Sequence, residues 1–303
     1  MMLSAVYLLG RHLPNIKGKY ALVFKGLGSL VPRWPSDVTV RSKQGISFVH
    51  CDLNDYIFKE LYTFGVHELD VDWIFDRLLQ PGDVIFDAGA SFGYHALLCA
   101  RRVGLEGHVF GVEPQPDMFA LLEQNIRLNQ VTNVTVRCIG LSDRTSKLAL
   151  HRFAGLGTGH TSVATLGRDD YETIECEAVT LDSFVEAEGI QRIAMLKLDV
   201  EGSELPILKG ADRLLRGAEP PMCVIEINSE TSQSCGYSPK DLLAFLATYG
   251  YSFYRCARGR VIRNISHLER CDSVDHGDNI LCAIWAAHAA RLRMAGVRAP
   301  HPA

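Results

Sequence analysis

The sequence lacks the closely spaced cysteine pairs that hold structural zinc, because none of its nine cysteines belongs to a Cys-x-x-Cys pair. Their number is odd, their positions are scattered, and several lie within apolar runs. Such cysteines are typical of small buried side chains in a reducing compartment, not of a disulfide framework. We therefore predict neither a zinc cluster nor a disulfide framework, and we assign no metal ligands.

Long apolar runs are also missing. No run approaches the roughly 20 apolar residues that a membrane-spanning helix needs. The N-terminal stretch MMLSAVYLLGRHLP is only a weak match to a signal peptide, since no basic residue precedes its short apolar part and no convincing cleavage site follows. We expect a cytoplasmic protein.

An excess of positive charge is absent from the chain as a whole. The formal net charge of −4 over 303 residues argues against a protein built to bind nucleic acid. Residues 1–50 are the exception, with seven Lys and Arg and the single acid Asp37. This segment can make weak contact with an anionic membrane surface or bind an anionic substrate. No amphipathic helix stands out in it, so a solvated, partly ordered extension is the simpler interpretation.

Short apolar runs alternate with helical patterns along most of the chain, which is typical of βαβ units and a parallel sheet. The predicted strands are residues 84–87, 108–112, 134–141, 193–199 and 222–227. The predicted helices are residues 94–103 and 116–129, one that begins after Ser203, and one from Ser238 to Gly250.

Other patterns flank this core. Residues 38–50 predict a hairpin, and residues 55–80 predict helix with a break at Gly65. Residues 147–153 and 174–180 favour antiparallel or edge strands around a mobile, glycine-rich loop at 155–162, and residues 251–256 and 279–285 favour a closing antiparallel pair. A short helix follows Ala286.

The turn after the first predicted strand contains Gly89 and Gly93. Ligands of open α/β sheets bind beyond the carboxyl ends of strands, and glycine there lets the backbone approach a ligand closely. The middle glycine of the dinucleotide fingerprint is missing, because Ala90 and Ser91 stand in its place. Asp87 would repel a diphosphate and suits a cation. The turn therefore favours S-adenosylmethionine over NAD.

Acids follow the next strands as well. Glu113 ends the second strand, 24 residues after Gly89, and an acid at that spacing is the usual partner of a ribose diol. Ser142 and Asp143 follow the third strand, where a polar pair can receive adenine, although Ser-Asp is also a common turn.

A lysine and three acids crowd the end of the strand at 193–199, in the stretch Lys197-Leu198-Asp199-Val200-Glu201-Gly202-Ser203-Glu204. Helix capping explains Glu204, but it does not explain Asp199 within an apolar run. We take Asp199 as the candidate base, with Glu201 second and the loop residue His160 a distant third. Lys197 can pair with these acids and keep them ionised.

At this point the sequence resembles the FkbM family of S-adenosylmethionine-dependent methyltransferases. The resemblance covers roughly residues 60–255, in the blocks VIFDAGASFGYHAL, VEPQP, GLSD, TLDSF and LKLDVEGSELPILKGA, and the stretch GVHE that ends at Glu68 matches the family's Gly-x-x-Glu lead-in. It implies an α/β, Rossmann-like class I methyltransferase fold with a seven-stranded, mostly parallel sheet whose last strand is antiparallel. It also implies O-methylation of a hydroxyl on a sugar, glycan or natural product.

The resemblance also implies roles for residues. Asp87, Gly89 and Glu113 would contact the cofactor, Asp143 would lie near adenine, and Asp199 would face the transferred methyl. The predicted cofactor-binding set is Glu68, Asp87, Gly89, Ala90, Ser91, Gly93, Tyr94, Glu113, Pro114, Ser142, Asp143 and Asp199. The sequence departs from the family at Ser91, where asparagine is usual, and after Glu226, where Ile227 and Asn228 replace a frequent histidine.

We divide the chain into a basic N-terminal extension with a hairpin (1–54), the methyltransferase domain (55–290) and a short basic tail (291–303). The extension and the loop at 155–175 are expected to shape the acceptor pocket. Two other functions stay open. The missing glycine and Asp87 count against a nicotinamide-dependent oxidoreductase, and Asp87, Glu113 and Asp199 count against a degenerate, non-catalytic scaffold that binds a partner.

Overall fold

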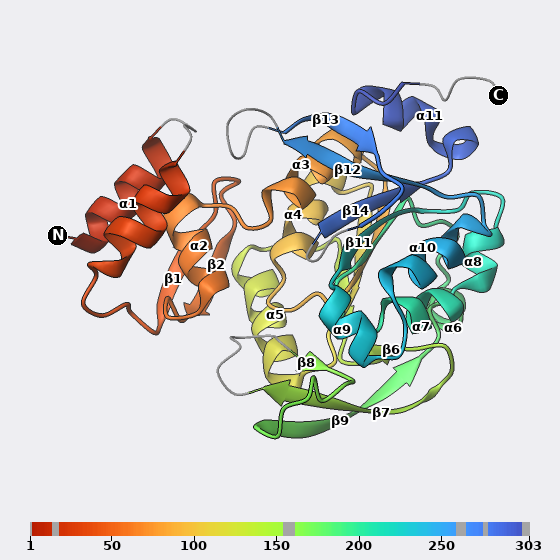
Figure 1. Cartoon of the computed structure of the whole chain (residues 1–303), viewed down its shortest axis with the longest axis horizontal. Coiled ribbons are helices and arrows are strands. Elements are labelled where there is room, and N and C mark those ends of the chain that lie inside the picture. Colours follow the sequence, from red (N-terminus) through yellow and green to blue (C-terminus); the bar gives the residue numbers. More distant parts are fainter. Residues whose placement is uncertain (1, 14–17, 154–160, 259–264, 275–277, 299–303) are drawn as a thin grey trace.

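A large sheet with helices on both faces forms the centre of the structure (Figure 1). This computed structural model describes residues 2–13, 18–153, 161–258, 265–274 and 278–298. The strands of the sheet are β3 (Val84–Ala88), β4 (His108–Val112), β5 (Val134–Arg137), β10 (Met195–Leu198), β11 (Met222–Ile227), β12 (Ser252–Arg258), β13 (Ile265–Arg270) and β14 (Asp278–Ala283). Their order across the sheet is β13-β12-β14-β11-β10-β3-β4-β5.

The five strands from β5 to β11 run parallel, as their apolar sequences predict. β14 is antiparallel to both β11 and β12, and Ser252 pairs with Ala283, which confirms the predicted closing pair. Within the described residues the sheet has eight strands, so the expected seven was wrong by one. The additional edge strand, β13, has only one buried position, and its polar sequence therefore lacks the apolar run of a central strand.

Two hydrophobic layers cover the sheet. One layer is formed by α3 (Leu69–Leu78), α4 (Tyr94–Val103), α5 (Pro116–Leu128) and α11 (Trp285–Met294). The other is formed by α6 (Leu181–Ala187), α7 (Glu204–Lys209), α8 (Asp212–Arg216) and α10 (Pro239–Ala247), while α9 (Ser229–Ser234) follows β11. The helices predicted from periodicity are therefore confirmed, and they enclose a sheet whose central strands are buried on both faces.

The N-terminal residues form a packed unit that stands at one end of the molecule (Figure 1). It consists of helix α1 (Met2–His12), a π-helical turn η1 (Ala21–Leu27), strands β1 (Val38–Arg41) and β2 (Ser47–Cys51), and helix α2 (Tyr56–Phe64). The predicted hairpin is confirmed by the pairing of Val40 with Phe48. The expectation of a solvated extension was wrong, because Val6 and Val23 are fully buried in the same core as Phe75.

Specific contacts hold this unit together. Gly10 lies so close to α2 that a Cβ atom there would be 2.1 Å from the Thr63 carbonyl oxygen. Arg11 donates hydrogen bonds to the carbonyl oxygens of Tyr62, Leu61 and Arg41, and thereby satisfies groups near the end of α2. At least one of the basic residues in 1–50, Arg11, therefore stabilises the fold through hydrogen bonds to the backbone.

A second, smaller sheet lies at the lower edge of Figure 1. It contains β6 (Gly140–Leu141), β7 (Ser146–Phe153), β8 (Thr161–Ser162) and β9 (Tyr171–Val179). β7 and β9 are antiparallel, as predicted for 147–153 and 174–180, whereas the single strand expected at 134–141 is split into β5 and β6. Residues 154–160, which hold most of the predicted glycine-rich loop and His160, lie outside the described residues.

The boundary predicted at residue 291 falls inside α11. Arg291 donates to both carboxylate oxygens of Asp83, and Leu292 is fully buried. The first part of the predicted tail is therefore integral to the domain. Over the described ranges, no helix combines the length and the hydropathy that spanning a bilayer requires.

Candidate active site

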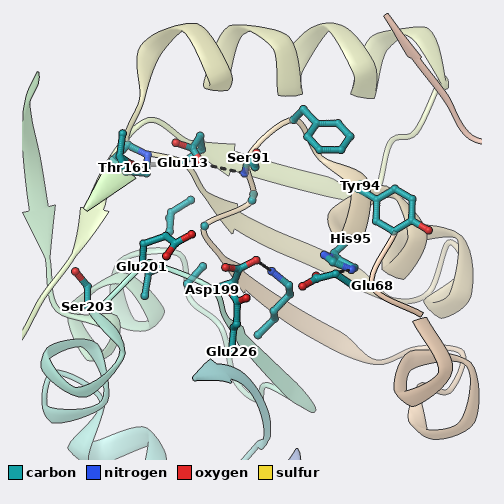
Figure 2. A pocket seen from close by; sticks show the side chains of 18 of the residues that line it. Glu68, Ser91, Tyr94, His95, Glu113, Thr161, Asp199, Glu201, Ser203 and Glu226 are labelled. Atoms are coloured by element: carbon teal, nitrogen blue, oxygen red, sulfur yellow. Dashed lines mark hydrogen bonds and ion pairs between the residues drawn. The ribbon is translucent and has the colours of Figure 1, made fainter. Parts of the chain in front are cut away.

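A cavity of about 560 Å³ opens at the carboxyl ends of β3, β4, β10 and β11 (Figure 2). Nine of the predicted site residues line it: Glu68, Gly89, Ala90, Ser91, Tyr94, Glu113, Pro114, Asp199 and Glu201. Among the residues that the structure describes, the cavity lining does not include Asp87, Gly93, Ser142 or Asp143. Contact of these four residues with a ligand stays a prediction. The small sheet contributes Leu148, Leu150 and Thr161 to the wall.

The glycine turn has no room for a side chain at its first residue, Gly89. Gly89 has a φ of +78°, and a Cβ atom there would be 1.9 Å from the Asp199 carbonyl oxygen. The turn therefore brings the end of β3 directly against the end of β10. Gly93, with a φ of +94°, instead makes room for Leu122, which is a packing role.

Glu113 holds the glycine turn in place. Its Oε2 accepts a hydrogen bond from the Ser91 backbone N–H and its Oε1 accepts one from that of Gln115, both at 2.9 Å. Burial raises the pKa of Glu113 to about 7, although the two hydrogen bonds favour the ionised form. Each carboxylate oxygen keeps a second lone pair, which leaves acceptors for two ligand hydroxyls. This geometry suits the predicted ribose contact.

Lys197 is the buried cation of the site. Its Nζ lies 2.9 Å from Asp199 Oδ2 and 3.7 Å from Asp87 Oδ1, because Lys197 and Asp87 are paired in register on neighbouring strands. Burial alone would lower the pKa of Lys197, but Asp199 and Asp87 outweigh it and raise that pKa. Burial raises the pKa of Asp87 to about 6 against the opposing effect of Lys197. Asp87 thus lies behind the cavity wall and holds Lys197.

Glu226, on β11, lies beside Asp199 in Figure 2, and both side chains line the cavity. Burial opposes ionisation of Asp199, yet Lys197 and Glu226 lower its pKa. The negative charge of Asp199, together with burial, raises the pKa of Glu226 well above its usual range. Glu226 was not among the predicted site residues, although the same signal as for Asp199, an acid within an apolar run, was present in MCVIEI.

A pair of unsatisfied atoms lies at the other side of the cavity. Glu68 Oε2 and His95 Nε2 are 3.5 Å apart, and neither has a hydrogen-bond partner among the residues that the structure describes. Burial raises the pKa of Glu68 and lowers the pKa of His95. Because unpaired buried polar atoms are costly, these two atoms mark a place for a polar ligand group. The sequence gave no separate signal for His95.

Tyr94 and Glu201 are fixed by the fold. The Tyr94 hydroxyl donates to Asp72 Oδ2 at 2.7 Å and accepts from the His67 backbone N–H at 3.1 Å. Glu201 has a left-handed φ of +49°, and its carbonyl oxygen accepts a hydrogen bond from Ser162 Oγ. In the part of the chain that the structure describes, no group of three or more His, Cys, Asp and Glu is arranged to hold a metal ion.

Comparison with known proteins gives the family. Residues 87–253 match the model of the methyltransferase FkbM domain. The chain is 29% identical over 180 residues to the hexuronic acid methyltransferase AglP of Haloferax volcanii, covering 59% of this chain and 68% of that protein. It is 29% identical over 212 residues to the 31-O-demethyl-FK506 methyltransferase FkbM of Streptomyces tacrolimicus, covering 58% and 77%.

Solved structures match at low identity. An O-methyltransferase of Bacillus cereus in complex with S-adenosylhomocysteine shares 12% identity, with a TM-score of 0.44 over 72% of this chain and 82% of that one. A Thermotoga maritima O-methyltransferase shares 18%, with a TM-score of 0.39 over 84% and 80%. The large sheet of five parallel strands with β14 antiparallel next to β11, in a chain that matches a methyltransferase family, is a class I methyltransferase fold. Since the family model spans more than half of the sequence, the chain belongs to the FkbM family of S-adenosylmethionine-dependent methyltransferases.

Proposed function

We propose that this methyltransferase transfers the methyl group to a hydroxyl of a sugar, glycan or natural product. The observation that carries the proposal is the meeting of Glu113, the Gly89 turn and the ionised Asp199 in one cavity at the head of the sheet. Two relatives support this acceptor class by their names: AglP is a hexuronic acid methyltransferase, and FkbM is a 31-O-demethyl-FK506 methyltransferase.

The cavity fits S-adenosylmethionine in size and in donor set. Its volume lies within the roughly 300–1,000 Å³ typical of ligand sites. Glu113 would accept from the ribose hydroxyls, the backbone of Gly89 and Ala90 would pass close to the ligand, and Glu68 Oε2 would accept from the ammonium group. Bound there, the compound supplies a methyl group activated by a sulfonium.

The chain's own contribution to the reaction is position and proton transfer. The acceptor hydroxyl must be held in line with the methyl group, which accounts for much of the rate enhancement in such transfers. It must also lose its proton. We assign Asp199 as the acceptor of that proton, because it is ionised and lines the cavity, and Glu201 as the second candidate.

The decisive experiment combines binding with product analysis. Calorimetry should give saturable heat with S-adenosylmethionine and none with NAD, and mass spectrometry of hydroxylated acceptors should find a gain of one methylene after incubation with the donor. Saturation with NAD alone would favour the oxidoreductase. Donor binding without transfer to any hydroxyl, but with transfer to an amine or carboxylate, would contradict O-methylation.

The proposal includes a cytoplasmic location and weak contact of the N-terminal unit with anionic membranes. Lys25 and Arg33 are exposed there, next to the exposed apolar side chains of Leu22 and Leu30. The protein should cosediment with phosphatidylglycerol vesicles and not with phosphatidylcholine vesicles. The double substitution Lys25→Gln and Arg33→Gln should reduce cosedimentation with phosphatidylglycerol. Equal binding to both vesicle types would refute an electrostatic contact.

A further inference from the structure

We propose that Glu226 and Asp199 act together as the proton acceptor, holding one shared proton in the free protein and releasing it to solvent when the sulfonium of the methyl donor enters the cavity. This inference rests on the proposed function, and it adds Glu226 as a catalytic residue. It also gives the site a carboxyl pair with both groups ionised only when the donor is loaded.

The strand register places the two carboxyl groups side by side. Leu198 of β10 pairs with Ile225 of β11, so Asp199 and Glu226 follow at the same level of neighbouring parallel strands. Both line the cavity, and their side chains lie beside each other (Figure 2). Two carboxyl groups in such close proximity repel each other when both are ionised, so the pair titrates as one unit.

Among the described residues, acidic groups outnumber the single lysine around the pair. The groups that face it are Lys197 and Glu201 at the end of β10, Asp87 on β3, His67, Glu68 and Asp70 near the start of α3, and His95 on α4, with the neutral Asn279 on β14. Lys197 is shared between Asp199 and Asp87, so it compensates only part of the negative charge.

One proton therefore suffices to relieve the remaining repulsion within the pair, as in other sites where two carboxyl groups share a proton. Asp199 stays ionised because its pKa is lowered, and Glu226 keeps the proton because its pKa is raised. A further positive charge in the cavity would favour ionisation of both groups and expel that proton.

The protons of the catalytic cycle then balance. The acceptor oxygen forms the new C–O bond while the C–S bond breaks, and sulfur keeps the electron pair and becomes a neutral thioether. The hydroxyl proton passes to the emptied carboxyl pair. The pair thus regains its single proton as the positive charge disappears, and the proton released on donor binding is the net proton of the reaction.

The test compares S-adenosylmethionine with S-adenosylhomocysteine, which has the same nucleoside and amino acid but an uncharged sulfur. Calorimetric titrations of the full chain at pH 7, in buffers of different ionisation enthalpy, give the protons released per ligand bound. We expect S-adenosylmethionine to release up to about one proton more than S-adenosylhomocysteine. Contributions from Glu113 and Glu68 cancel, because both ligands carry the ribose and the ammonium group.

Variants locate the source of the proton. In Glu226→Gln, S-adenosylmethionine should still bind, but its extra proton release should vanish. Glu204→Gln is the matched control, since burial also raises the pKa of Glu204, which is bonded to Tyr237 and lies outside the described cavity lining. This control should release the proton as the unaltered protein does. Equal release with both ligands, or release that persists in Glu226→Gln, would overturn the proposal.

Infrared difference spectra of the unaltered protein provide a second measurement that needs no variant. The band of a protonated carboxyl group should be lost on addition of S-adenosylmethionine and retained with S-adenosylhomocysteine. If the band is unaffected by either ligand, the pair does not release its proton. Failure of S-adenosylmethionine to bind at all would instead refute the proposed function.

Discussion

At the scale of single residues, the site depends on one buried cation. Lys197 compensates Asp199 and Asp87 at the ends of adjacent strands, and its side chain is almost fully buried. Replacing it leaves two carboxyl groups without their counter-charge. Removal of one partner of a buried ion pair typically costs about 3–5 kcal/mol.

We expect Lys197→Met to lower the free energy of unfolding by about that amount. Urea denaturation at pH 7 would measure the change. Lys209→Met, at an exposed position on α7, is the control and should leave stability nearly unchanged. A Lys197→Met protein as stable as the control would show that the two carboxyl groups are compensated by something else.

The candidate base gives a kinetic prediction. Asp199→Asn preserves shape but cannot accept a proton, so we expect kcat to fall about 100-fold to 10,000-fold, with the donor still bound. Glu201→Gln should lose less. If the Glu201 variant were the more impaired of the two in steady-state turnover, the order of the two candidates would be reversed.

Buried carboxyl groups predict how stability depends on pH. The pKa of Glu113 is raised by burial to about 7 in the folded protein, so this group stabilises the fold fully below its unfolded pKa of about 4.3 and loses that contribution as pH rises through about 7. Between pH 5 and 8, the unaltered protein should therefore lose free energy of unfolding relative to Glu113→Gln, by about 1–3 kcal/mol. Urea denaturation across this range measures it.

The comparison needs a control for general charge effects. Glu106→Gln changes the same charge at an exposed position and should follow the unaltered protein at every pH. A Glu113→Gln protein that loses stability in parallel with the unaltered one would mean that Glu113 is ionised at a lower pH than the structure indicates.

At the scale of elements, Gly89 in the turn between β3 and α4 can be compared with Gly82 in the turn before β3. Gly89 and Gly82 have similar positive φ angles, +78° and +84°, but only Gly89 lacks space for a Cβ atom. Gly82→Ala should cost roughly 1–2 kcal/mol from its backbone conformation alone. Gly89→Ala should cost more and also weaken donor binding, because the Asp199 backbone must move.

Denaturation and calorimetry with S-adenosylmethionine would separate the two effects. We expect donor affinity to be unchanged in Gly82→Ala and to fall at least tenfold, about 1.4 kcal/mol, in Gly89→Ala. Equal affinity in both variants would contradict a cavity formed by close approach of β3 to β10.

Elements with strong local patterns were also the ones that the sequence predicted well. The strands β3, β10 and β11 are mostly apolar, and this composition predicts that they are buried. The glycine turn and the acids that follow these strands indicate the site by their residue types. β13 escaped prediction because an edge strand with one buried position has no such composition. His95 and Glu226 could not be assigned to the site from the sequence, because their roles depend on neighbours from other parts of the chain, Glu68 and Asp199.

At the scale of the whole molecule, the main surprise is the integration of the N-terminal unit. Its charge suggested a solvated segment, but its apolar side chains, among them those of Val6, Val23 and Phe48, belong to the main core. Local charge counts do not report such long-range packing. For the same reason, deleting residues 1–33 would expose that core, so acceptor recognition by this unit is better tested by substitutions at its exposed positions.

The contact between α1 and α2 has a consequence for how the protein is made. Arg11 bonds to the carbonyl oxygen of Tyr62, 51 positions further along the chain, and Gly10 fits against Thr63. A ribosome synthesises from the N-terminus, so α1 is made before its packing partner α2. The nearby η1 can contact α1 early, but the part of the core between α1 and α2 can close only after residues 56–64 have been made.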